Sequence, residues 1–166
     1  MVSASSEAPT LDRTDALLWR DLVTMLLTVG RALEGRLQRE AGISVPDYDI
    51  LSTLCAAPAG QMRPRDLGLG LQWEKSRLSH QLRRMEARGL VDRSVCAADG
   101  RGALVGATAA GRAAYERARP GFTEELHARF GRQLDPADGD RLYALVQRVL
   151  STVDLEDVCT APSPDC

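Results

Sequence analysis

Apolar residues recur every three or four positions through residues 11–41, which is the period of a helix with one broad apolar face. The recurrence begins at Leu18 and continues to Leu37. Gly30 and Gly35 fall inside it, and each glycine weakens a helix by roughly 1 kcal/mol relative to alanine. The pattern predicts one long helix, in which the two glycines either allow another helix to approach closely or are tolerated defects.

A second helix is predicted after Gly42, in the segment SVPDYDILSTLC. Either Ser44 or Asp47 can cap this helix, and Pro46 is favourable in a first helical turn. The segment AAPAGQ then reads as a turn. The next segment, RPRDLGLGL, predicts a short third helix with a proline in its first turn.

A fourth helix is predicted from about residue 74 to residue 88, and Gly89 can end it. Leu78, Leu82 and Met85 lie four and three positions apart, so they predict the buried stripe of this helix. The opposite face is polar and basic. It carries Lys75, Ser76, Arg77, Ser79, His80, Arg83 and Arg84.

Residues 90–95 and 103–105 are short strand-like runs on either side of AADGRG, whose aspartate and glycines suit a hairpin turn. Thr108 can cap the helix that follows, but Pro120 and Gly121 predict a kink or a break in it. An Asp-Pro pair at 135–136 predicts the start of the last helix. The predicted class is mainly α with a small β-hairpin.

The composition indicates an ordinary globular protein, with 44% hydrophobic and 27% charged residues among 166. No apolar run approaches the ~20 residues that a membrane span needs, so no membrane partner is expected. The first residues, MVSASSEAPT, do not resemble a secretory signal, and a cytoplasmic location is therefore expected.

The cysteines and histidines do not suggest a metal site or an enzyme. Cys55, Cys96, Cys159 and Cys166 include no CxxC pair and are expected to be free thiols, so neither a metal nor another cofactor is expected. The chain has two histidines and lacks the P-loop, GxGxxG, HExxH and GxSxG motifs. A non-enzymatic function is predicted.

Positive charge is concentrated in one segment. Residues 61–102 hold nine basic and five acidic residues, a net charge of +4, whereas the whole chain carries −2 and the remainder therefore −6. An acidic protein with one basic segment is typical of a chain that presents one surface to a polyanion. The alternative is that the basic face of the fourth helix is merely solvated.

Along the chain, helices are followed by a helix with a basic face and then by a hairpin, which is the order of elements in a winged helix-turn-helix. In that arrangement the small Ser76 and Ser79 allow close approach to the major groove of DNA, and Arg77 can bond the O6 and N7 atoms of guanine. Arg101, at the hairpin tip, would lie over the minor groove unless it is simply an exposed loop residue. Trp73, just before the basic helix, is interpreted mainly as a core residue.

Three further motifs carry a family resemblance: RDLGLGLQWEKSRLSHQLRRMEARGLVDR, the tip Asp99-Gly100-Arg101 and the helix start ATAAGRAAYE. Together they resemble the MarR family of bacterial transcription regulators, over residues 11–153. The resemblance implies an obligate homodimer whose first and last helices intertwine and whose winged helices bind a palindromic operator. It also implies that Asp99 holds the wing arginine, Arg101, in place. Many relatives have a small hydroxyl residue at position 77, so their operator sequences cannot be carried over.

The resemblance implies a domain organisation and a repressor role. We expect a flexible N-terminus at 1–10, a helical dimerisation region at 11–41 and 108–153, a winged helix-turn-helix DNA-binding lobe at 42–107, and a disordered acidic tail at 154–166.

Family members typically respond to small phenolic or anionic ligands bound between the dimerisation helices and the DNA-binding lobe. The candidates by position are Trp19, Arg20 and Tyr48, which offer an apolar wall and a cation. The favoured alternative is that Trp19 and Tyr48 are plain core residues and that Arg20 forms a surface ion pair. One alternative is a thiol-based redox regulator acting through Cys96, with Cys55 expected to be buried and inert. Another is a winged-helix module that binds proteins and not DNA.

Overall fold

The computed structural model of the protein describes residues 12–95 and 103–152. The expected wing tip with Asp99 and Arg101, the thiol of Cys96 and both chain ends lie outside the described residues. The elements are α1 (Arg13–Ala41), α2 (Val45–Ala56), β1 (Gln61–Met62), α3 (Pro64–Leu71), α4 (Lys75–Ala87), β2 (Val91–Val95), β3 (Ala103–Ala107), α5 (Ala109–Arg129), the 3-10 turn η1 (Gly131–Gln133) and α6 (Pro136–Leu150).

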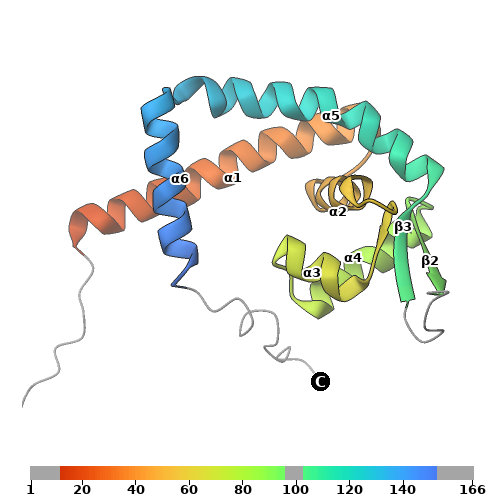
Figure 1. Cartoon of the computed structure of the whole chain (residues 1–166). Helices are drawn as coiled ribbons and strands as arrows, with labels where there is room; N and C mark the ends of the chain where they lie inside the picture. Colours follow the sequence, from red (N-terminus) through yellow and green to blue (C-terminus); the bar gives the residue numbers. More distant parts are fainter. Residues whose placement is uncertain (1–11, 96–102, 153–166) are drawn as a thin grey trace, which may run out of the picture.

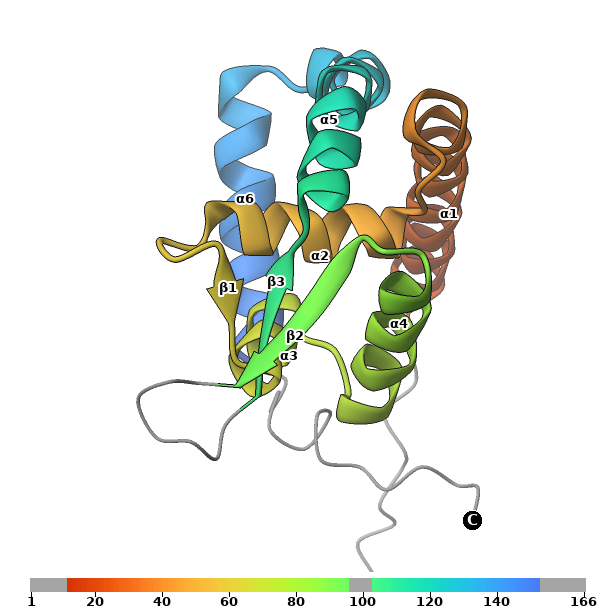
Figure 2. The ribbon, with the colours of Figure 1, turned by 90° about the vertical axis from the view of Figure 1, so that its right-hand side faces the viewer.

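The two long helices α1 and α5 run side by side, and α2, α3, α4 and the sheet form a lobe beneath them (Figure 1). In Figure 1 α6 overlaps α1, but Figure 2 shows the two helices on opposite sides of α5. Among the described residues α6 buries none of its own side chains. The lobe is therefore a packed unit, whereas α6 and the N-terminal half of α1 project from it.

The sheet contains three antiparallel strands in the order β1-β3-β2. The predicted hairpin strands pair in register from Val91 opposite Ala107 to Val95 opposite Ala103. The third strand, β1, was not predicted and pairs with β3 through Gln61. Because β1 has two residues, it is too short to show the alternating pattern by which a strand is recognised in a sequence.

The α5 helix continues through Pro120, so of the kink or break expected there, the break is not observed. Pro120 is exposed, whereas Ala114, Ala118 and Gly121 are buried on the packed side of the helix. A carboxylate oxygen of Glu40, on α1, lies only 2.0 Å from where a β-carbon on residue 121 would be. Close packing against α1 along this small-residue face offsets the hydrogen bond that proline cannot make.

The first turn of α2 resolves which residue caps that helix. The Ser44 hydroxyl accepts a hydrogen bond from the Asp47 backbone N–H, and the Asp47 carboxylate accepts one from the Ser44 backbone N–H. Both candidates thus take part in one capping box. The Val45 backbone N–H donates a hydrogen bond to the carboxylate of Glu34 of α1 at 2.7 Å, which joins the end of α1 to the start of α2.

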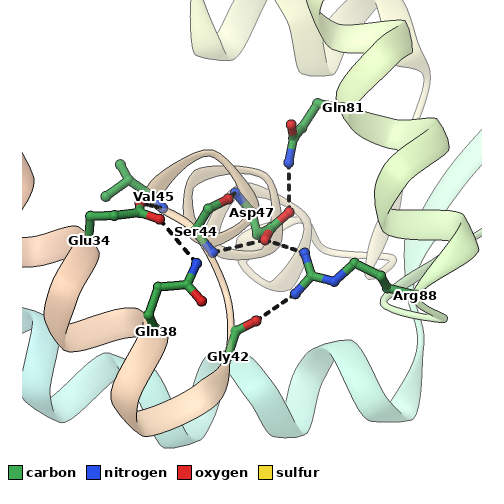
Figure 3. Close-up of polar contacts among 8 residues, drawn as sticks. All are labelled: Glu34, Gln38, Gly42, Ser44, Val45, Asp47, Gln81 and Arg88. Carbon is green, nitrogen blue, oxygen red and sulfur yellow. Dashed lines mark hydrogen bonds and ion pairs between the residues drawn. The ribbon is translucent and has the colours of Figure 1, made fainter.

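The Asp47 carboxylate is fully buried and also holds the fourth helix (Figure 3). It accepts hydrogen bonds from the Gln81 amide and from the Arg88 guanidinium, both at 2.7 Å. Arg88 donates a second bond, at 2.6 Å, to the carbonyl of Gly42. These contacts, here called the Asp47 network, tie α4 to the junction between α1 and α2.

The charge of Asp47 is maintained by its donors. Burial by itself would raise the pKa of this carboxyl group, but the hydrogen bonds donated by Ser44 and Arg88 outweigh burial and hold the pKa below its ordinary value. A carboxylate with a lowered pKa stabilises the folded state above the ordinary carboxyl pKa. That contribution is lost as the pH falls through the lowered value.

We predict that Asp47→Asn lowers the free energy of unfolding by about 1.5–3 kcal/mol at neutral pH, the usual range for a hydrogen bond to a charged group. The difference from the wild type should begin to shrink below about pH 4, where Asp47 of the unfolded chain takes up a proton, and should be lost as the pH falls through the lowered pKa of the folded state. Urea unfolding at several pH values and one protein concentration measures both effects.

The matched control is Asp21→Asn, because Asp21 is also paired with an arginine but its side chain is 65% exposed. Its effect should stay within about 0.5 kcal/mol. Equal effects of the two substitutions, or a pH-independent effect of Asp47→Asn, would contradict the role of the Asp47 network.

We also predict that Gly111→Ala destabilises the fold by about 1–3 kcal/mol, because small-to-large changes in packed sites force the backbone to move. A β-carbon on residue 111 would lie 2.0 Å from the Leu90 carbonyl oxygen. The control is Gly70→Ala on α3, where a β-carbon meets no atom within 4 Å. Thermal unfolding should show a lower midpoint for the first variant and an unchanged or higher one for the second.

Candidate nucleic-acid interface

The α4 helix separates its apolar and polar side chains as the sequence predicts. Leu78, Leu82 and Met85 are buried, together with Gln81, whose amide belongs to the Asp47 network. The residues predicted for the outer face are all exposed. They are Lys75, Ser76, Arg77, Ser79, His80, Arg83 and Arg84.

Gln81 and Arg88 are positioning residues that the sequence reading missed. Gln81 lies in the same buried stripe as its apolar neighbours, and a polar residue at such a position signals a buried partner. Arg88 was counted only as a basic charge, yet its guanidinium is paired with Asp47. Arg93 of β2, which was also included in the net charge of residues 61–102, is paired with Glu86 of α4 at 2.9 Å.

Because Arg88 and Arg93 are paired with carboxylates, they add little free positive charge beside the α4 face. The pair between Arg93 and Glu86 also links the first strand of the hairpin to the end of α4. The predicted wing contacts of Asp99 and Arg101 lie outside the described residues.

The start of α4 has its own polar arrangement. Glu74 is the N-cap residue, and its carboxylate accepts a hydrogen bond from the Ser76 hydroxyl at 2.6 Å. A carboxylate at this end of a helix is stabilised by the helix dipole. Trp73, expected in the core, is 8% exposed, and the guanidinium carbon of Arg77 lies over its ring at 4.2 Å from the centroid.

The predicted ligand residues are not brought together within one chain. Trp19 is 66% exposed, and Arg20 is exposed and bonds to its neighbour Asp21. Roughly 30 Å of helix separates Trp19 from the end of α1 that packs on the lobe. Tyr48 of α2 is instead buried, and its ring stacks on that of Phe122 with 4.1 Å between the ring centroids.

The environments of Tyr48 and Cys55 raise the pKa of both side chains. Burial, with a smaller contribution from Tyr115, raises the pKa of the Tyr48 hydroxyl to about 12. Cys55 is only half-buried, where full burial was expected, because it lies at the edge of the core. The burial it has still raises the pKa of its thiol, which lowers the thiolate fraction needed for redox chemistry.

No group of three His, Cys, Asp or Glu side chains within residues 12–95 and 103–152 is arranged to hold a metal ion. In the same part of the chain, none of the helices combines the length and apolarity needed to cross a membrane.

Comparison with known proteins agrees with the geometry of the lobe. The MarR family model matches residues 41–102. AbsC, a MarR family transcriptional regulator from Streptomyces coelicolor, is 30% identical, with 87% of this chain and 97% of AbsC covered and a TM-score of 0.81. A second MarR family transcriptional regulator from the same organism, solved in complex with DNA, is 27% identical, with 90% and 94% covered and a TM-score of 0.83.

A mutant of MarR from E. coli, complexed with operator DNA, shares the fold at 24% identity, with 84% of this chain and 99% of that chain covered and a TM-score of 0.73. No curated protein matches the chain by sequence. These matched structures are of transcriptional regulators and not of enzymes. With a family relative matched over nearly its whole length and the same winged helix-turn-helix fold, the chain belongs to the MarR family of transcriptional regulators.

Proposed function

We propose that this regulator is a repressor that binds a palindromic operator as a homodimer and is released from it by a small ligand. The observation that carries the proposal is the exposed polar face of α4, which is held in a fixed orientation by buried contacts on its other side. A relative that is 27% identical has been solved in complex with DNA.

The proposed reading of DNA divides the α4 face into two parts. Near the start of the helix, Ser76 and Ser79 allow close approach to the base edges, and Arg77 bonds guanine O6 and N7. The long or basic side chains around and behind them contact phosphates and fix the register. These are Lys75, His80, Arg83 and Arg84. In the wing, Asp99 would hold Arg101 for insertion into the minor groove.

A homodimer is favoured by apolar side chains that the single chain leaves exposed. On α1 these include Leu18, Trp19 and Leu26, and on α6 they include Val146 and Val149. An apolar surface of this extent is normally covered in a soluble protein. We propose that α1 and α6 of two subunits cover one another, and that the pairing sets the distance between the two α4 helices.

The proposed effector is a small aromatic or anionic molecule. Trp19 and Arg20 are exposed in the single chain, so a dimer places them near a second subunit, while Tyr48 lies between the lobe and α5. Redox control through Cys55 is disfavoured by its raised pKa. Redox control through Cys96 and binding of proteins in place of DNA are the alternatives.

We predict that Arg77→Ala reduces discrimination at one operator base pair by about 1–3 kcal/mol, because the bidentate contact to guanine is lost. Lys75→Ala should weaken binding to all sequences alike and reduce the salt dependence by about one counterion, because a phosphate contact is lost. Fluorescence anisotropy with duplexes selected from a random pool, at several salt concentrations, measures both.

The control is Arg117→Ala, since Arg117 is exposed on α5, away from the α4 face. It should leave the sequence preference and the salt dependence unchanged. Unaltered preference in Arg77→Ala would show that Arg77 does not read a base. Absence of salt-dependent binding to any duplex would favour the protein-binding alternative.

We predict that Leu26→Asp and Val149→Asp each convert a dimer into monomers, because a charge placed in an apolar interface is left without a partner. Sedimentation velocity measures the mass of each variant. Leu69→Asp is the control, because Leu69 is an exposed apolar residue on α3, outside both helices, and its variant should remain dimeric. A wild-type chain that sediments as a monomer at micromolar concentration would refute the dimer.

A further inference from the structure

The ring of Trp73 lies directly beneath the side chain of Arg77. The guanidinium carbon of Arg77 is 4.2 Å from the centroid of the ring. Trp73 is 8% exposed, whereas Arg77 is exposed, so one face of the guanidinium meets the protein and the rest meets solvent. The contact joins the turn before α4 to the first turn of α4 itself.

The backbone fixes the position of Trp73. Gln72 adopts a left-handed conformation with φ of 55°, which is the one positive φ among the described residues other than glycine. The Trp73 N–H then donates to the carbonyl of Gly68 at 2.9 Å. A β-carbon at residue 68 would already touch Leu78 and the Trp73 backbone at 3.4 Å, so α3 and α4 approach closely here. The indole is thereby a rigid support.

Stacking leaves the binding capacity of the arginine intact. A guanidinium group attracts an aromatic ring through its flat face, while its N–H donors point outward in its own plane. The stack also limits the rotamers of a long and flexible side chain, so less conformational entropy is lost when the donors meet an acceptor. The Asp49 carboxyl group of α2 interacts electrostatically with Arg77. Burial raises the pKa of Asp49, and the positive charge of Arg77 opposes that rise.

We propose that Trp73 is a positioning residue for Arg77 and thereby a determinant of operator specificity: its ring holds the guanidinium ready to read a guanine. The inference rests on the proposed DNA-binding function. It assigns to Trp73 a role beyond filling the core. The contrary possibility is that the ring merely stores Arg77 away from DNA, in which case removing the ring would strengthen binding.

The stack itself is testable without DNA. NMR of the full chain should show the side-chain protons of Arg77, identified by their loss in Arg77→Ala, shifted upfield by the ring current of Trp73. In Trp73→Leu these protons should return towards ordinary arginine positions, and in Trp73→Phe they should return only in part. Unshifted Arg77 protons in the wild type would overturn the inference, whatever the chain does with DNA.

The effect on specificity is tested by a double-mutant cycle on the selected operator and its single-base variants. Trp73→Leu should lower discrimination at the base pair read by Arg77 roughly two- to tenfold, the range for one cation–π contact. Trp73→Phe should lower it less. When Arg77 is already alanine, Trp73→Leu should have no further effect on that base pair.

Equal loss of discrimination in both backgrounds would show that Trp73 acts only through the general fold, and would overturn the inference. Unchanged or tighter binding in Trp73→Leu would do the same. Thermal unfolding identifies a variant that fails to fold, and Trp73→Phe then carries the test because it keeps an aromatic ring in the site. Failure of the wild type to bind any duplex overturns the proposed function as well, and so is distinguished from these outcomes.

Discussion

The buried carboxylate of Asp47 constrains the arrangement of the whole lobe. An ionised group without contact to water is costly unless donors surround it, and here the donors come from three different places in the chain. The Ser44 backbone, the Gln81 amide and the Arg88 guanidinium must all be in place at the same time. The orientation of α4 is therefore tied to the first turn of α2, and α4 cannot turn independently without leaving a charge unpaired.

The same constraint extends to α1 and α5. The second bond of Arg88 ends on the carbonyl of Gly42, where α1 stops, and Glu34 of α1 bonds the first residue of α2. Arg36 of α1 in turn pairs with Glu40 and with Glu124 of α5. A displacement of these long helices thus moves α2 and α4 together. This connection gives a physical route from the outer helices to the proposed DNA-binding face of α4, without requiring any element to unfold.

The sequence predicts features that depend on neighbouring residues and fails where distant residues decide. Caps, helix limits and the buried stripe of α4 follow from local spacing, so Leu78, Leu82 and Met85 were placed correctly. Of the kink or break expected at Pro120, the break does not occur, because packing of α5 against α1 outweighs the local cost. Arg88 was counted as surface charge since its partner, Asp47, lies 41 residues earlier. The contact between Trp73 and Arg77 is different, because it spans only four positions but depends on the left-handed turn at Gln72, which the sequence pattern does not reveal.

A buried ion pair is weak evidence for stability, because apolar residues of similar size often stabilise a core as well or better. The Asp47 network instead fixes the orientation of α4, because a network of hydrogen bonds is satisfied in one geometry, whereas apolar packing tolerates several. This matters for the proposed dimer, in which the two α4 helices would enter successive major grooves about 34 Å apart. A small rotation of α4 within each subunit would then displace Arg77 from its proposed base edge in both half-sites at once. We therefore expect Gln81, whose side chain faces inward, to influence sequence reading as strongly as some of the residues proposed to contact DNA.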